Sequence, residues 1–494
     1  MAVSPPLTVL GKLSKSTHDP LRNPDGACGS VPWLGWFFVG IIFSWPLQVL
    51  THAAQVAVLA YLPLLGTMAS AYCNGIKVKC PPPVFKWSER VLLLGLACVL
   101  IHEIANNLHH ATILESIKWL GIWLTSAWVY IYVSRFASVK ELKRALSMLG
   151  AIGLVLALYW MYDTYVKTIL WLPSDFGLMQ ADYIVMRNSV DGQTWIPNAS
   201  IYAQQYRAVG LYSSYALTST LVTLGLFAVL SFQTNSRMWR KFAIGTVGIL
   251  ILSVGGGTTA LVLFAMIFPI VIICLRLPQE RIKSAEAWMA MLAVALVLFF
   301  ATAIASQSAL NKLLMSRIEI FQAQLHFLIN LSKQEIRSSF GTTLNTSYPE
   351  LYVNSVKSTA HYLTNNPIVA LVGEGRKSAQ AEAFPRGGDF GLMDWVVTFG
   401  LPLVASLLAV LSLGSYKSFQ VLSGRAKRFD ADGLIMFAGS ALLFVLGSLI
   451  HYNVAFDKTL LPITMFSIGL AHRFSGNLQP LQQSSLDRPH TVNH

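Results

Sequence analysis

Residues 31–50 read V-P-W-L-G-W-F-F-V-G-I-I-F-S-W-P-L-Q-V-L and contain no Asp, Glu, Lys or Arg. A helix of about 20 apolar residues covers the roughly 30 Å hydrocarbon core of a bilayer, so this stretch predicts a membrane span. Similar runs recur along the chain, and because they are continuous rather than alternating they predict helices and exclude a membrane barrel. The predicted spans are 31–50, 53–72, 91–108, 117–134, 145–163, 209–232, 242–254, 258–275, 286–305, 393–415, 433–450 and 459–472.

The composition is also that of a polytopic membrane protein. Of the 494 residues, 54% are hydrophobic and 12% are charged, whereas soluble domains carry roughly 25% charged residues. The low fraction of charged residues excludes an ordinary cytosolic enzyme, a disordered regulator and a nucleic-acid-binding protein. The net charge of +13 therefore indicates basic loops on the cytoplasmic side of a membrane rather than a nucleic-acid partner. The five cysteines are scattered and predict neither a disulfide framework nor a zinc site.

The distribution of charge between alternate connections predicts the orientation. Lys and Arg concentrate in the cytoplasmic loops of membrane proteins. Alternate connections and both tails hold 23 of the 36 Lys and Arg residues, for example Arg135, Lys140, Lys143 and Arg144 between the fourth and fifth spans. We therefore expect a multi-pass protein with about 12 transmembrane helices and with both termini in the cytoplasm.

Two of the connections on the opposite side are long. Loops of this length are usually functional or disordered, and these two contain aromatic residues and helical runs, so we expect them to be functional. The second loop is predicted to be partly helical, with a helix that ends at Asn365-Asn366-Pro367. The predicted all-α organisation is a cytoplasmic tail (1–30), N-terminal transmembrane helices (31–163), a first external loop (164–208), central transmembrane helices (209–305), a large external loop that forms a lid and a site (306–392), C-terminal transmembrane helices (393–472) and a cytoplasmic tail (473–494).

Arg207 is the most informative of the external cations. It lies in Q-Q-Y-R-A-V-G-L-Y, residues 204–212, where the first external loop enters a predicted span. An arginine at this depth is costly unless it is paired or hydrated, and guanidinium binds phosphate through bidentate charge-assisted bonds. The segment therefore predicts an anion site, with Tyr206 and Tyr212 as sugar-stacking candidates. The alternative is an arginine that reaches lipid head groups.

A second charged cluster lies at the end of the large loop. Gly373-Glu374-Gly375-Arg376-Lys377 is followed by Arg386 and Asp389, just before the span at 393. Basic groups beside a carboxylate suit a site that holds a diphosphate and removes a proton from a hydroxyl. No strand precedes the glycines, so a nucleotide-binding loop is excluded. The alternative is a charged glycine-rich loop at the membrane interface.

His361 lies four residues after Lys357 and therefore on the same face of the predicted loop helix. This pattern favours decoration of a helix surface, and the alternative is a base or a ligand contact. No Asp-x-Asp motif is present, and the histidines have no metal-site spacing. The sequence therefore predicts no metal and no cofactor.

Several segments occur in an order that resembles the O-antigen polymerase/O-antigen ligase superfamily, over about residues 200–415. They are Arg207-Ala208-Val209-Gly210-Leu211-Tyr212, Ser253-Val254-Gly255-Gly256-Gly257, Ala360–Pro367, Gly373-Glu374-Gly375, Asp389-Phe390-Gly391 and Thr398-Phe399-Gly400-Leu401-Pro402. The hairpin of this family commonly carries Ser-Arg-Gly, and here the arginine is replaced by Val254-Gly255.

The resemblance implies a metal-independent membrane glycosyltransferase in the bacterial inner membrane that uses an undecaprenyl-diphosphate-linked oligosaccharide on the periplasmic side. Members of the family use outward-facing arginines for the diphosphate, which implies that role for Arg207, and we expect Arg376 and Arg386 of the second cluster to act with it. The basic residue that the family carries early in its loop helix is not obvious here, and Lys357 or Arg337 is the candidate to stand in for it. Asp389 or His361 is then the catalytic base.

Gly388-Asp389 stands where ligases carry a histidine, which favours a polymerase of O-antigen or exopolysaccharide repeat units. The alternatives are an O-antigen ligase that transfers the glycan to lipid A-core, and a carrier for a glycan lipid or small anion. Internal repeats are typical of carriers, and none is evident here. The expected partners are the lipid-linked oligosaccharide, membrane lipids and a chain-length regulator protein, and no nucleic acid.

Overall fold

The computed structural model describes residues 31–74, 113–169, 210–212, 215–234, 236–274, 334–337, 343–346, 348–374, 391–423, 431–449 and 458–475, with isolated helical positions at 90, 93, 97, 100 and 179. Almost all of this part is helical, as the sequence predicts. The exception is a short antiparallel hairpin in the large loop, formed by β1 (Gln334–Arg337) and β2 (Thr343–Thr346).

The helices follow the predicted apolar runs closely. Their bounds are α1 (Trp33–Thr51), η1 (Ala54–Tyr61), α2 (Leu62–Asn74), α4 (Ile113–Ile131), η2 (Tyr132–Phe136), α5 (Val139–Ile169), α8 (Tyr215–Ser231), α9 (Met238–Gly255), α10 (Thr258–Cys274), α13 (Tyr348–Asn365), α14 (Pro367–Val372), α16 (Gly391–Phe399), α17 (Leu401–Ser423), α18 (Asp432–Ser448) and α19 (Leu460–Ser475). The predicted span 286–305 and nearly all of 91–108 lie outside the described residues.

By length and composition, five described helical runs are apolar enough to cross a membrane. They are α1 (Trp33–Thr51), the continuous run of η1 and α2 (Gln55–Cys73), most of α5 (Val139–Val166), α9 (Met238–Gly255) and α17 (Leu401–Ser423). Four shorter apolar helices accompany them: Ala216–Ser231, Thr259–Cys274, Asp432–Ser448 and Leu460–Phe474. Large apolar side chains are exposed on their outer faces, among them Leu158 (64%), Met266 (63%) and Ile273 (63%). Such exposure is unusual in soluble monomers and is expected where lipid covers the surface.

Two predicted spans are wrong in their bounds. The run 209–232 begins with a turn at 210–212, and its helix α8 starts only at Tyr215. The run 393–415 was expected to be a single helix, but it divides at Gly400 into α16 and α17. Gly400 has φ +80°, and a Cβ there would lie 2.6 Å from the Leu371 carbonyl oxygen, so the backbone turns closely against α14. α16 packs on the loop helices α13 and α14, so its residues are apolar like those of α17. Because the sequence stays apolar across the turn, a hydropathy profile does not show where the helix divides.

The turn at Gly255-Gly256-Gly257 is confirmed. α9 ends at Gly255 and α10 begins at Thr258, with φ +78° at Gly256. The Gly256 N–H donates to the Ser253 carbonyl (3.2 Å) and the Gly257 N–H to the Leu252 carbonyl (3.2 Å), which satisfies carbonyls that the helix end leaves free.

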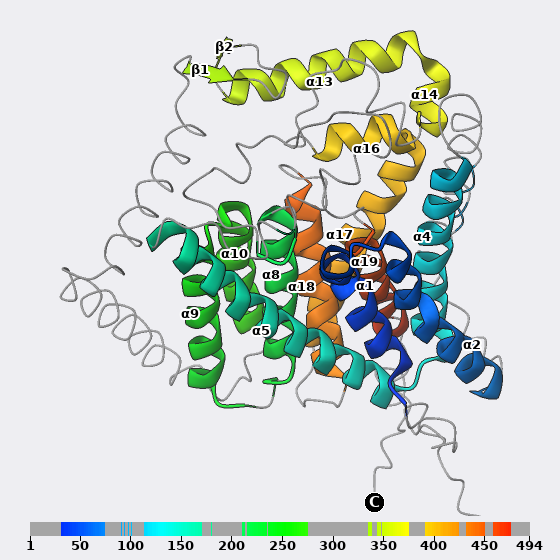
Figure 1. Cartoon of the computed structure of the whole chain (residues 1–494), viewed down its shortest axis with the longest axis vertical. Helices are drawn as coiled ribbons and strands as arrows, with labels where there is room; N and C mark the ends of the chain where they lie inside the picture. Colours follow the sequence, from blue (N-terminus) through cyan, green and yellow to red (C-terminus); the bar gives the residue numbers. More distant parts are fainter. Residues whose placement is uncertain are drawn as a thin grey trace, which may run out of the picture.

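Helix contacts define two ends of the bundle (Figure 1). The end of α8 meets the start of α18, where a Cβ on Gly433 would lie 2.4 Å from the Ser231 carbonyl oxygen. At the other end, Gly447 of α18 packs on Leu263 near the start of α10. We call the end that holds Arg135, Lys140, Lys143, Arg144, Arg237, Arg240 and Arg473 the basic end. The opposite end, across which α13 lies, is the loop end (Figure 1, top).

A polar cluster ties four elements together at the basic end. The Tyr132 hydroxyl donates to Glu141 Oε2 (2.6 Å) and is hydrogen-bonded to the Ser70 hydroxyl (3.1 Å). Arg473 of α19 donates to the carbonyls of Val133 (3.1 Å) and Ala137 at the end of η2. The guanidinium thus caps a helix C-terminus, where the helix dipole favours a cation.

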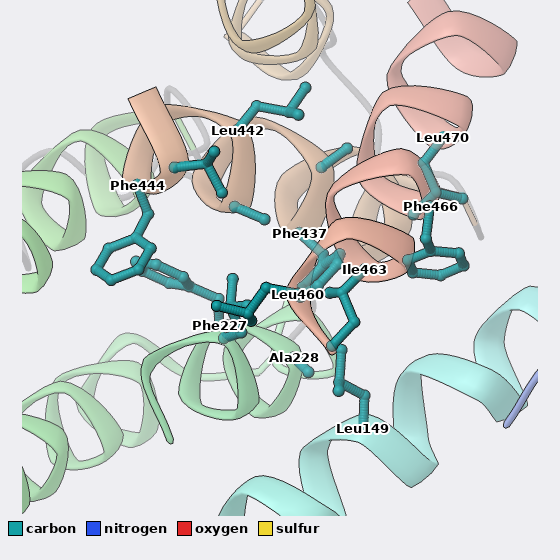
Figure 2. Close-up of a cluster of buried hydrophobic side chains, with 14 of the residues drawn as sticks. Leu149, Phe227, Ala228, Phe437, Leu442, Phe444, Leu460, Ile463, Phe466 and Leu470 are labelled. Atoms are coloured by element: carbon teal, nitrogen blue, oxygen red, sulfur yellow. The ribbon is translucent and has the colours of Figure 1, made fainter. Parts of the chain in front are cut away.

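The apolar core lies where α5, α8, α18 and α19 meet (Figure 2). Phe227 of α8 packs on Phe444 of α18, with ring centroids 6.2 Å apart. Phe437 of α18 packs on Phe466 of α19, with centroids 5.9 Å apart. All four rings are almost completely buried, so these helices form one packed unit that supports the loop end.

Helices α5 and α8 cross at Gly153 and Gly225, where their backbones are too close to leave room for a side chain. A Cβ on Gly153 would lie 2.5 Å from the Gly225 Cα, and the reverse distance is also 2.5 Å. The obstacle is backbone on both sides, so neither helix relieves the clash by rotating a side chain. Small residues at such crossings are typical of packed membrane helices.

We predict that Gly153→Ala destabilises the protein by about 1–3 kcal/mol, because the added methyl group overpacks the crossing. The matched control is Gly121→Ala in α4, where a Cβ would meet no atom within 4 Å. That substitution is expected to be neutral or to raise stability by up to about 1 kcal/mol through helix propensity. Thermal unfolding of the detergent-purified variants measures both effects, and equal melting temperatures would contradict the proposed packing.

Candidate functional site

The described part of the Arg207 segment is the turn Gly210–Tyr212, which is fixed to α5 by a buried carboxylate. The Gly210 N–H donates to Asp163 Oδ2 (2.9 Å). Asp163 is 1% exposed, and its Oδ1 has no hydrogen-bond partner among the described residues. A buried carboxylate with one free oxygen is costly. The chain therefore keeps a buried carboxyl group at the point where the first external loop reaches the bundle.

Trp160 brings two of the resemblance segments together. Its ring is 0% exposed and lies one helical turn before Asp163. A Cβ on Gly255 would lie 2.5 Å from Trp160 Cη2, and one on Gly257 would lie 3.1 Å from the same atom. A Cβ on Gly210 would lie 3.4 Å from Trp160 Cδ1. The indole thus fills the space between the Gly210 turn and the Gly255–Gly257 hairpin.

Tyr212 closes the turn on α1. The side chain is 2% exposed, and its hydroxyl donates to the Ile42 carbonyl (2.5 Å). Leu211 packs on Val49 of the same helix. These contacts give Tyr212 a structural role in joining the turn to α1, and its predicted contact with a sugar stays a prediction.

The glycine motif at the end of α14 meets the end of α16. Glu374 N–H donates to the Val397 carbonyl (2.8 Å), and a Cβ on Gly373 would lie 2.2 Å from the Thr398 carbonyl oxygen. Glu374 itself is 6% exposed. Residues 373–374 and 398–402, which are 24 or more residues apart in the sequence, are therefore adjacent at the loop end.

His361 and Lys357 lie on α13, which crosses the loop end and contacts α14 and α16 (Figure 1). Both side chains are exposed. Asn365 and His361 Nε2 are hydrogen-bonded over one helical turn (Asn365 Nδ2 to His361 Nε2, 3.1 Å). α13 ends at Asn365 and α14 begins at Pro367, as the sequence predicts. Both residues therefore lie at the predicted end of the bundle, on a solvent-facing helix.

Five predicted site residues lie outside the described residues: Arg207, Tyr206, Arg376, Arg386 and Asp389. Their predicted roles stay predictions. Among the residues that the structure describes, no group of three or more His, Cys, Asp or Glu side chains is arranged to hold a metal ion.

Two residues at the centre of this arrangement, Trp160 and Asp163, were not predicted from the sequence. Asp163 has a recognisable signal, because it is the acidic residue at the outer end of a long apolar run that begins after Arg144. The packing of Trp160 against glycines 95 or more positions later has no such signal, because it depends on how α5, α9 and α10 meet.

No protein-family model matches this chain, and no curated protein matches it. The resemblance of its motifs to the O-antigen polymerase/O-antigen ligase superfamily therefore stays a prediction.

We predict that Asp163→Ala lowers the stability by about 1–3 kcal/mol, because it leaves the buried Gly210 N–H without an acceptor. Asp163→Asn keeps an acceptor oxygen and is expected to cost less. Thermal unfolding of the purified variants measures the difference. The control is Thr164→Val, which removes a hydroxyl that only donates to the Trp160 carbonyl one turn earlier (2.7 Å). An alanine variant as stable as the asparagine variant would exclude an anchoring role for the carboxylate.

Proposed function

We propose that this chain is a metal-independent membrane glycosyltransferase. It polymerises undecaprenyl-diphosphate-linked oligosaccharide repeat units into O-antigen or exopolysaccharide on the periplasmic face of the bacterial inner membrane. The observation that carries the proposal is the meeting of the Gly210 turn with the Gly255–Gly257 hairpin around Trp160 and Asp163. Both segments belong to the family resemblance, and their packing at one end of the bundle supports treating them as parts of one site.

The charge distribution supports the periplasmic placement of this site. Cations of the described residues gather at the basic end, for example Arg135 and Arg237, and the positive-inside rule assigns such an end to the cytoplasm. The loop end then faces the periplasm, where lipid-linked repeat units are presented. An even number of spans, about 12, brings the chain back to the side where it starts, so both termini are cytoplasmic.

The proposed reaction transfers a glycan from a diphosphate to a hydroxyl. The acceptor oxygen attacks the anomeric carbon of the donor through an oxocarbenium-like state, as in glycoside chemistry. The bond from that carbon to the diphosphate oxygen breaks, and undecaprenyl diphosphate leaves with the electron pair. Asp389 or His361 takes the acceptor's proton. Arg207, Arg376 and Arg386 neutralise the diphosphate and thereby improve the leaving group.

The large external loop is proposed to exclude water, because the donor would otherwise be hydrolysed. α13 crosses the loop end and contacts α14 and α16, which supports a cover at this end of the bundle. A chain-length regulator protein is proposed as a partner at this surface.

We predict that Arg207→Ala lowers the initial rate of polymerisation by at least about 100-fold, because a guanidinium aimed at the leaving diphosphate is lost. The assay incubates purified protein with undecaprenyl-diphosphate oligosaccharide and separates the products by length. The control is Arg240→Ala, which removes an exposed arginine at the basic end and is expected to leave the rate unchanged.

The products also separate the alternatives. A ladder of lengthened chains supports the polymerase, label on added lipid A-core supports the ligase, and no transfer supports a carrier. Full activity of Arg207→Ala would refute the role proposed for the arginine.

A further inference from the structure

Two large apolar side chains of α14 are exposed at the loop end. Ile368 is 70% exposed and Leu371 is 64% exposed. They are three positions apart and therefore lie on one face of the helix. Exposed apolar side chains that gather on one face mark places where a protein meets a partner or a membrane. α14 thus presents an apolar face that the described helices leave uncovered.

The exposed surface changes from polar to apolar at the bend between α13 and α14. α14 is the hexapeptide P-I-V-A-L-V, in which no side chain is charged or polar. It begins after Asn366, whose side-chain amide donates to the Tyr362 carbonyl (3.0 Å), and it ends at Gly373. The exposed residues of the preceding helix α13 include Asn354, Lys357, Ser358, His361 and Thr364. The apolar face therefore belongs to α14 as a separate unit and does not continue the surface of α13.

α14 ends where a helix long enough to cross a membrane begins. A Cβ on Gly400 would lie 2.6 Å from the Leu371 carbonyl oxygen and 2.9 Å from the Gly373 nitrogen. α17 starts at the next residue, Leu401, and has 23 residues. A helix of this length spans about 35 Å, slightly more than the hydrocarbon core of about 30 Å. The Gly400 turn, and the end of α14 with it, therefore lies at the membrane boundary of the loop end.

The apolar face of α14 adjoins a surface that lipid covers. α14 contacts both α16 and α17 (Figure 1). Leu401, on the other side of the Gly400 turn from Leu371, is 50% exposed at the start of α17. A bilayer that covers the exposed start of α17 also reaches α14. Large apolar side chains at this depth are favoured in the boundary between head groups and acyl chains rather than in water.

We infer that α14 is an interfacial anchor, which inserts Ile368 and Leu371 into the bilayer leaflet at the loop end. The occupant of this face is lipid rather than a protein, because the face adjoins the start of α17 and offers a partner no charged or hydrogen-bonding side chain. Only Asn366 separates α14 from α13, so the anchor also places the adjoining end of α13 at the membrane surface. The inference does not depend on the proposed function.

The test measures the depth of a nitroxide label in the bilayer. Ile368→Cys and Leu371→Cys are made in the full-length chain, with its five native cysteines replaced by serine, and are labelled in phosphatidylcholine nanodiscs. Power saturation compares relaxation by oxygen, which dissolves among acyl chains, with relaxation by a water-soluble nickel chelate. Both labels are expected to be accessible to oxygen and protected from the nickel chelate, at a depth of about 5–10 Å, as for other interfacial helices.

Val353→Cys is the matched control. Val353 is also a large apolar residue of the same external loop and is 48% exposed, but it lies on α13, four residues before Lys357. Its label is expected to be accessible to the nickel chelate. Met266→Cys on α10, at a position that is 63% exposed, is the lipid-facing reference and is expected to be accessible to oxygen alone.

Two results would overturn the inference. Labels at 368 and 371 that the nickel chelate reaches as well as it reaches position 353 would place α14 in water. Labels that neither oxygen nor the chelate reaches would show that protein covers α14, either another part of this chain, a second copy or a different partner.

A second measurement serves if the cysteine-free chain does not keep the melting temperature of the wild type. Benzoylphenylalanine replaces Ile368, Leu371 or Val353 in the chain with its native cysteines, and the irradiated protein is analysed by mass spectrometry. Phosphatidylcholine adducts are expected at 368 and 371 and not at 353. Peptide crosslinks in place of lipid adducts at 368 and 371, or the absence of any adduct there, would refute the anchor.

Discussion

The packing of one buried indole organises the loop end of this protein. Trp160 occupies the volume that side chains at Gly255 and Gly257 would otherwise fill, and one turn later Asp163 holds the Gly210 N–H at 2.9 Å. Interiors packed this densely do not deform continuously, so the hairpin, the turn and the outer part of α5 have one mutual arrangement. This arrangement fixes where the chain after Arg207 enters the bundle.

The two ends of the bundle differ in chemistry. The basic end carries arginines and lysines and closes on a buried cluster in which Tyr132 bonds Glu141 and Arg473 caps η2. The loop end carries fewer described cations, and Lys458 is held there on Trp45. Because charge in a membrane protein is costly unless it is paired or hydrated, the few cations retained at the loop end are the best candidates for binding an anionic lipid.

The sequence predicted much of the fold because apolar periodicity and helix breakers are local signals. The hairpin at Gly255–Gly257 and the helix end at Asn365 were found in this way. The division of the 393–415 run was missed, since Gly400 turns against α14, a contact that no local pattern reveals. For the same reason Trp160 was missed, and Tyr212 was assigned to substrate although its hydroxyl bonds the Ile42 carbonyl. Arg207 was proposed from its position beside a predicted span, which is again a local signal, and it lies outside the described residues.

The most direct test of the account is photocrosslinking with an undecaprenyl diphosphate analogue that carries a diazirine beside the diphosphate. The protein is labelled in nanodiscs, digested, and the modified peptides are identified by mass spectrometry. The account predicts label in the peptide that contains residues 204–212, reduced by unlabelled undecaprenyl diphosphate. Label confined to the basic end, or spread evenly over the exposed apolar helix faces, would contradict it.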